Sequence, residues 1–227
     1  MYVLTLPRST IGKKVIMAVT GLIYVGYVVV HMYGNLKVFL GATYFNEYAE
    51  GLRSLGAPLL GHLHLLTIAR IVLVAALVLH IWAALTLTRQ AQRARPTAYT
   101  IKKNVQANAA SLSMRWGGLA LLLFVIYHLA HLTWGTPGVH NDFIRGDAYY
   151  NLVTGLQNPI AGFVYSVGMI ALGFHLYHGV WSMFQTLGLS VDSTEKPIRA
   201  LAVALAVLVP AGFIAVPIAI WLGLVTV

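Results

Sequence analysis

Six histidines lie within long apolar stretches of this sequence, where an imidazole without a partner is costly. They are His31, His80, His128, His131, His175 and His178. A neutral imidazole can bind a metal ion, pass on a proton or hydrogen-bond to a neighbouring helix. The chain has no cysteine, which excludes disulfides, thiolate-bound iron–sulfur clusters and covalent attachment of a c-type haem by this chain. Any redox centre must therefore be held by other ligands, and histidine is the obvious donor.

The elements that position these histidines are long apolar segments. The chain has 227 residues, of which 59% are hydrophobic and only 9% are charged, whereas about a quarter of the residues in soluble domains are charged. Stretches of about 20 apolar residues, enough for a helix to span a bilayer, occur at 15–39, 63–87, 116–134, 160–187 and 200–224. The runs are continuous rather than alternating, which disfavours barrel strands. We expect an all-α membrane protein in which residues 1–227 form a single five-helix domain.

Basic residues are distributed unequally between the two sides of the expected bundle. One side holds Arg8, Lys13, Lys14, Arg89, Arg93, Arg95, Lys102, Lys103, Arg115, Lys196 and Arg199. The other holds Lys37, Arg53 and Arg145, with Arg70 near the start of the second segment. Because short cytoplasmic loops carry the excess of Lys and Arg, this pattern predicts the N-terminus inside and the C-terminus outside. The formal charge of +9 mostly reflects this asymmetry and needs no nucleic-acid partner. It also favours attraction to anionic lipid or to an acidic partner surface.

Depth in the membrane sorts four histidines into two layers. A helix rises about 1.5 Å per residue, so His31, seventeen residues after Lys14, lies about 26 Å from the inner edge. His128, thirteen residues after Arg115, lies about 20 Å from that edge, which places it in the same layer as His31.

The second layer lies nearer the inside. His80 is nine residues before Arg89, about 13 Å from the inner edge, and His175 is sixteen residues after Pro159, about 24 Å from the outer edge. Two depths, each with one histidine from each of two helices, fit two six-coordinate haems held between imidazoles. In the alternative interpretation the histidines have a structural role, and each one only hydrogen-bonds to an adjacent helix. His62, His64 and His140 fall near the outer interface, where we expect solvated or headgroup-facing side chains.

Several motifs carry a resemblance to a known family. They are TGLIYVGYVVVHMYGN, FNEYAEGLRSL, LVLHIWAAL, the RW…IYH spacing that leads to His128, and FHLYHGVWSMFQTLG. Over nearly its whole length the chain resembles the cytochrome b membrane anchor of bacterial succinate dehydrogenase and fumarate reductase, of the five-helix, two-haem type. The resemblance implies axial pairs His31 with His128 for the outer haem b and His80 with His175 for the inner one. It also makes His131 and His178 neighbours of ligands rather than ligands.

The same resemblance implies a role and partners. A flavoprotein subunit would interconvert succinate and fumarate, and an iron–sulfur subunit would pass electrons to the inner haem, the outer haem and then a quinone, expected to be menaquinone. The implied location is the bacterial cytoplasmic membrane. Haem propionates need cationic or polar donors. Arg89, Arg93, Lys102 and Lys103 are candidates at the inner haem, although a positive-inside signal explains them as well, and Arg70 and His131 are candidates at the outer haem.

A titratable group near the outer haem is needed for quinone reduction, which consumes protons. Glu47 and Glu50 are the only carboxylates between the first two segments. The resembling fumarate reductases use an acidic residue at the outer end of this region, and spacing from His31 favours Glu50. An ordinary solvated carboxylate is the competing interpretation.

Two other classes of protein compete with this interpretation. A di-haem anchor of a hydrogenase or formate dehydrogenase would carry electrons in the same way, but FHLYHGVWSMFQTLG argues against it. A histidine-based transporter would be colourless and would have broken helices at mid-membrane. Only the last segment has mid-span prolines, Pro210 and Pro217, and it carries no histidine. The sequence leaves the haem potentials, the direction of turnover and the oligomeric state of the complex open.

Overall fold

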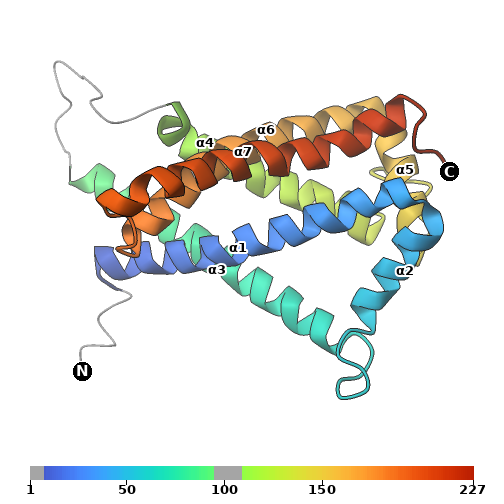
Figure 1. Cartoon of the computed structure of the whole chain (residues 1–227), viewed down its shortest axis with the longest axis horizontal. Coiled ribbons are helices and arrows are strands. Elements are labelled where there is room, and N and C mark those ends of the chain that lie inside the picture. The colour runs from blue at the N-terminus through green and yellow to red at the C-terminus, as the bar shows by residue number, and fades with distance from the viewer. Residues whose placement is uncertain (1–7, 95–108) are drawn as a thin grey trace.

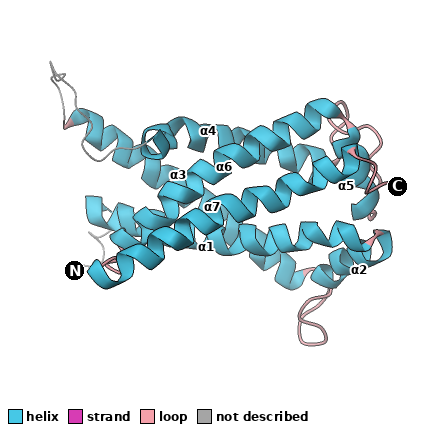
Figure 2. Cartoon of the chain, turned by 45° about the horizontal axis from the view of Figure 1, so that its top comes forward, coloured by secondary structure: helices cyan, strands magenta, loops and turns pink. Residues whose placement is uncertain are grey.

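The computed structural model describes residues 8–94 and 109–227, and all regular structure in these ranges is helical (Figure 2). In chain order the elements are α1 (Thr10–Leu36), the 3-10 turn η3 (Lys37–Leu40), α2 (Ala42–Arg53), α3 (His64–Arg93), α4 (Ala109–His128), the π-helical turn η4 (Leu129–Trp134), α5 (Ala148–Gln157), α6 (Pro159–Thr186) and α7 (Asp192–Trp221).

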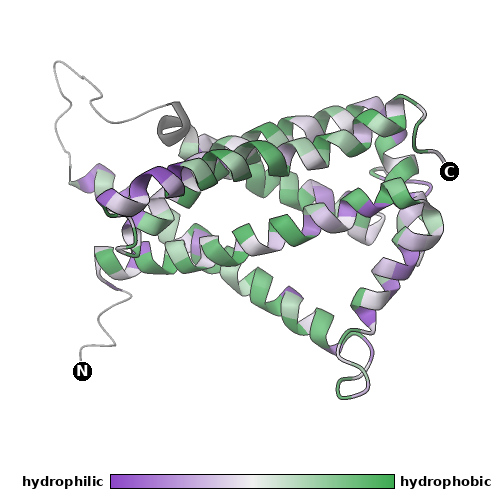
Figure 3. Cartoon of the chain, viewed as in Figure 1, coloured by the Kyte–Doolittle hydropathy of each residue, from purple (hydrophilic) through white to green (hydrophobic). Residues whose placement is uncertain are grey.

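Five of these helical segments are long and apolar enough to cross a membrane, as expected. Apolar residues dominate them, whereas polar residues gather at the start of α7 and along α2 (Figure 3). The ends of α6 agree with the sequence prediction to within one residue. This helix begins with Pro159 at its first position, and the Asn158 side chain accepts hydrogen bonds from the Ile160 and Ala161 amides. Such an N-cap satisfies donors that would otherwise be exposed at the helix end.

Four of the long helices, α1, α3, α4 and α7, extend beyond one end of their predicted apolar stretches. α3 continues past residue 87 to Arg93, and α7 begins at Asp192 rather than at residue 200 and ends at Trp221. The first turn of α7 carries Asp192 and Glu195, whose negative charges are favourable at a helix N-terminus. Glu195 also binds Arg199 at 2.7 Å. Counting apolar residues misses such charged turns because they lie outside the hydrocarbon region.

Two short helices, α2 and α5, were not predicted from the sequence. Both lie at the end of the bundle that holds the C-terminus (Figure 1). Asn46 of α2 joins them, because its Nδ2 donates to Asp147 Oδ1 and its Oδ1 accepts from the Tyr149 amide, each at 2.9 Å. Asp147 also caps α5 by accepting from the Tyr150 amide. The connection between the third and fourth spans is therefore fixed to the connection between the first two.

The bundle is built around α6 and α1. α6 packs against α7 and α4, while α1 packs against α3, α6 and α7. The N-terminal half of α3 diverges from α1 toward the α2–α3 loop (Figure 1). Among the described residues, neither α1 with α4 nor α3 with α6 is a closely packed pair of helices. These two pairs are the ones that carry the facing histidines.

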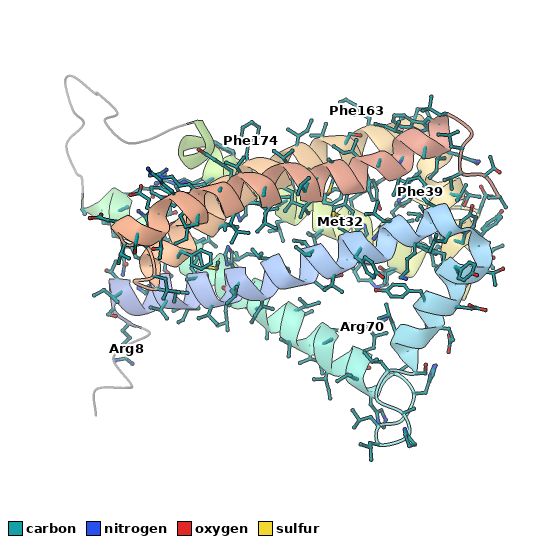
Figure 4. All side chains as sticks on the ribbon, in the orientation of Figure 1. Arg8, Met32, Phe39, Arg70, Phe163 and Phe174 are labelled. Carbon is teal, nitrogen blue, oxygen red and sulfur yellow. The ribbon has the colours of Figure 1, made fainter. Side chains whose placement is uncertain are left out.

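Apolar packing is concentrated along α7. One cluster joins α5 to the C-terminal part of α7 and contains Val38, Tyr149, Leu152, Val153, Leu156, Val216, Ala219, Ile220 and Val225. A second cluster joins α6 to α7 through Leu176, Val180, Ala202 and Val209. Met32 projects from α1 toward α7 (Figure 4), and a Cβ at Gly212 would lie 2.5 Å from its sulfur. Small residues thus let these helices approach closely, as is common in membranes.

Candidate functional site

The structure brings His31 of α1 and His128 of α4 together. Their ring centroids are 5.9 Å apart and the ring planes are at 81°. Tyr27 stacks on His31 at 5.3 Å, and Phe124 stacks on His128 at 6.0 Å. Each stacking residue precedes its histidine by four positions, so it lies on the same helix face one turn earlier. Each imidazole therefore has an aromatic ring of its own helix stacked on it.

A second facing pair is formed by His80 of α3 and His175 of α6. Their ring centroids are 6.2 Å apart. His80 Nδ1 lies 3.0 Å from Thr20 Oγ1 of α1, whereas His175 Nδ1 is buried and has no hydrogen-bond partner among the described residues. The α6 segment at His175 lines a small cavity of about 160 Å³ together with Met114, Gly117, Ala171 and Phe174. The two pairs are those predicted from membrane depth.

His131 and His140 form a buried polar cluster beside the first pair. His131 is only 1% exposed, and Tyr165 contributes its hydroxyl 3.1 Å from the Nδ1 atoms of both His128 and His131. His140 Nδ1 donates to the His131 carbonyl at 3.1 Å, and His140 Nε2 lies 3.2 Å from Thr154 Oγ1. His131 belongs to the π-helical turn η4, and such turns often occur at functional sites.

The expected location of His140 was wrong. It was predicted to be solvated at the outer interface, but it is 7% exposed. The cause is α5, whose Gly155 lies against both rings, since a Cβ there would be 3.0 Å from His131 Nε2 and from His140 Cε1. His62 and His64 are exposed, as expected.

His178 lies in the C-terminal half of α6 and does not belong to either facing pair. Its ring contacts Trp181 at 6.3 Å, and Arg199 lies 4.3 Å above the Trp181 ring. The Trp181 Nε1 atom is buried without a hydrogen-bond partner. The position of His178, one turn beyond His175, is that of a neighbour rather than of a member of a pair.

The basic residues suggested for propionates lie at different heights on α3. Arg70 is exposed on the part of α3 that diverges from α1 (Figure 4). Arg89 and Arg93 are exposed near the other end of the same helix. Within the described part of the chain, Arg70 and Arg89 donate no side-chain hydrogen bond. Lys102 and Lys103 lie outside the described residues.

Glu50 lies in the last turn of α2 and forms an exposed cluster. It accepts a hydrogen bond from Arg53 at 2.8 Å and lies 3.0 Å from His62 Nε2. The hydrogen bond from Arg53 is the main cause, and that from His62 the second, of a pKa for Glu50 below the usual value of a glutamate. At neutral pH this side chain is therefore a carboxylate.

The donor set limits which metal centre the facing pairs can form. In the described ranges, no three or more His, Asp or Glu side chains gather as a metal site. A protein-only zinc site needs three or four protein ligands, whereas each pair offers two imidazoles. In haem the porphyrin supplies the four equatorial nitrogens, so two axial histidines complete the coordination.

The distances and the helix packing agree with this donor set. Two imidazoles that bind one metal ion from opposite sides at about 2.0 Å each have ring centroids about 6 Å apart, close to the observed 5.9 and 6.2 Å. Gly117 and Gly118 of α4 have no atom within 4 Å of a Cβ built on them. The residues present therefore fit a group that would be held by two imidazoles from different helices.

Sequence reasoning missed Thr20 and Tyr165, although both contact predicted ligands. Thr20 is 60 residues from His80, and Tyr165 is 37 residues from His128. A threonine or tyrosine in an apolar run is an available signal, but it does not say which histidine the hydroxyl will meet.

Comparison with known proteins identifies the family. The model of the succinate dehydrogenase/fumarate reductase transmembrane subunit family matches residues 88–215. This stretch contains His128, His131, His175 and His178, whereas His31 and His80 precede it. No curated protein and no solved structure matches the chain. Because the family match covers more than half of the chain and the five long helices agree with a membrane subunit, the protein belongs to the succinate dehydrogenase/fumarate reductase transmembrane subunit family.

Proposed function

We propose that this membrane anchor subunit carries two b-type haems within a single domain and passes electrons between its partner subunits and a quinone. Membership of the family makes the chain a multi-pass membrane subunit of a succinate:quinone oxidoreductase complex, with flavoprotein and iron–sulfur subunits as partners. Haem b and quinone binding are known in this family. The observation that carries the proposal is the presence of two facing histidine pairs on four different helices.

The axial ligands in this proposal are His31 with His128 for one haem and His80 with His175 for the other. Each haem, when bound, supplies a one-electron redox centre with no open coordination position. The protein holds the imidazoles apart and keeps the surroundings apolar. The proposed donors to the haem propionates are Arg89, near the inner end of α3, for the inner haem, and Arg70 and His131 for the outer haem.

The orientation that we propose follows from the Lys and Arg distribution, with the start of α1 inside and the C-terminus outside. The His80–His175 pair then lies closer to the iron–sulfur subunit, and electrons reach the His31–His128 pair next and finally menaquinone. The location would be the bacterial cytoplasmic membrane. Accessibility of the two ends of the chain to a protease added outside intact spheroplasts tests this orientation, and cleavage at the N-terminal end alone would reverse it.

The proposed function is tested by a dithionite-reduced minus oxidised absorption spectrum of the purified complex, with haem quantified per anchor chain. We expect two b-type haems per chain. A complex with intact partner subunits but no haem would contradict the proposal and return the histidines to a packing or transport role.

Glu50 is the proposed proton relay for quinone reduction. It is titratable, lies at the outer end of the bundle in the proposed orientation, and contacts a second titratable side chain, His62. Its lowered pKa means that the carboxylate and its ion pair with Arg53 persist at neutral pH and are lost as the pH falls through that lowered value. It can therefore accept a proton and return to the charged form.

We expect Glu50→Gln to slow succinate:quinone turnover by about 10²-fold, which is a typical effect for a positioned acid or base. Both haems should remain bound, because Glu50 contacts neither histidine pair. The measurement is the quinone reduction rate compared with succinate oxidation by a soluble electron acceptor. Glu47→Gln, on the same helix, is the matched control, and equal quinone rates in both variants and the unmodified complex would remove Glu50 from the mechanism.

A further inference from the structure

Each facing pair contains one histidine whose ring contacts a hydroxyl group and one whose ring does not. His80 lies beside Thr20 and His128 lies beside Tyr165. Within the part of the chain that the structure describes, His175 Nδ1 is buried without a partner and the His31 ring makes no hydrogen bond. The two members of a pair therefore experience different surroundings.

The direction of the Thr20–His80 hydrogen bond follows from the other contacts of the threonine. Thr20 Oγ1 lies 2.7 Å from the Ile16 carbonyl of the preceding helical turn, and this carbonyl can only accept. The single hydroxyl hydrogen of Thr20 is therefore donated to Ile16. The remaining lone pairs of Oγ1 accept from His80 Nδ1–H at 3.0 Å.

A fixed proton on Nδ1 determines what the other ring nitrogen can do. In neutral imidazole only one nitrogen carries hydrogen, so His80 Nε2 keeps its lone pair. Thr20 itself is 5% exposed and cannot exchange this contact for water. The threonine thus holds the His80 ring in the tautomer and orientation of a metal ligand.

The second pair has the same arrangement with a phenol in place of the threonine. The Tyr165 oxygen lies 3.1 Å from both His128 Nδ1 and His131 Nδ1. For His128 to present Nε2, its Nδ1–H donates to the phenol oxygen, and the phenol hydrogen then goes to His131 Nδ1. His131 in turn carries its proton on Nε2, so one hydroxyl fixes the tautomers of two buried histidines.

We infer that Thr20 and Tyr165 are positioning residues that orient one axial histidine of each pair and, by accepting its Nδ1–H, strengthen it as a donor to iron. This inference rests on the proposed haem ligation. Donation from Nδ1–H makes an imidazole more basic, which favours ferric over ferrous iron. Removing the acceptor should therefore raise the reduction potential of that haem and leave the other haem unchanged.

The test is a redox titration of the intact complex carrying Thr20→Val, which keeps the shape of the side chain but lacks the hydroxyl. We expect the preference of the inner haem for the ferric over the ferrous state to fall about tenfold. For a one-electron couple this corresponds to a rise of about 59 mV in its reduction potential. Thr20→Ser should restore the original potential and the low-spin ferric signal. Thr86→Val is the matched control, because Thr86 also donates to the carbonyl one turn earlier, at 2.9 Å, but contacts no histidine.

The outcomes separate this inference from the proposed function. Loss of the inner haem in Thr20→Val but not in Thr20→Ser would support the positioning role as directly as a shifted potential. An unchanged potential in Thr20→Val, or equal damage by Val and Ser, would overturn it while leaving the haem ligands in place. Absence of haem from the unmodified complex would instead overturn the proposed function together with this inference. Tyr165→Phe should shift the potential of the outer haem only.

Discussion

A complex that carries His175→Ala is expected to contain one b-type haem per anchor chain instead of two. Alanine has no metal-binding atom, and the facing His80 ring, 6.2 Å away, cannot fill both axial positions. The retained haem should be the one between His31 and His128. The measurement is haem per chain in the purified complex, by pyridine haemochrome and by the number of components in a redox titration.

Double variants test whether the histidines act in the pairs seen in the structure. His80→Ala with His175→Ala should cost no more haem than either change alone, since both remove the same site. His175→Ala with His128→Ala should remove both haems. His64→Ala is the control, because its side chain is exposed at the start of α3. Full haem content in His175→Ala would show that His175 is not an axial ligand.

The second large effect is expected from a glycine that contacts no histidine. Gly168 of α6 is buried, and a Cβ added there would lie 2.6 Å from Phe124 Cδ2 and 2.8 Å from Phe124 Cγ. The Phe124 ring packs on both His128 and Tyr165. Gly168→Ala should therefore displace the ring that supports His128, with a cost of about 1–3 kcal/mol typical of overpacking.

We expect Gly168→Ala to lower the occupancy of the outer haem and the temperature at which it is released, while the inner haem stays bound. The measurement is the haem content after mild heating, with the two haems distinguished by their reduction potentials. Gly179→Ala is the matched control on the same helix, because a Cβ at Gly179 has no atom within 4 Å. Equal behaviour of the two variants would mean that the contact between α6 and Phe124 does not support the outer site.

The histidine pairs were accessible from the sequence because membrane helices have a nearly fixed geometry. Charged residues such as Lys14 and Arg115 mark where a span begins, and the constant rise of a helix then gives the depth of His31 and His128. Rotation about the helix axis needs no separate prediction here, since polar side chains in a membrane face the bundle interior. Depth and facing together were sufficient to select the two pairs of histidine rings that lie about 6 Å apart in the structure.

The contacts around the pairs were not accessible in the same way. α5 is short and starts after a polar loop, so hydropathy over a 20-residue window does not detect it. Missing α5 also meant missing the burial of His140, which depends on Gly155 lying over its ring. The change of helix type after α4 was not predicted either. A π-helical turn at Leu129–Trp134 changes which residues face inward after His128.

The link between Asn46 and Asp147 also constrains how the chain is built. The two residues are 101 positions apart, so at a synthesis rate of about 5–20 residues per second α2 waits roughly 5–20 s for its partner. During that interval two further spans must enter the bilayer. The contacts of Glu50 with Arg53 and His62 are ones that the early loop can already make. The end of the bundle that holds α2 and α5 therefore closes late, after the helices that carry His31, His80 and His128 have started to assemble.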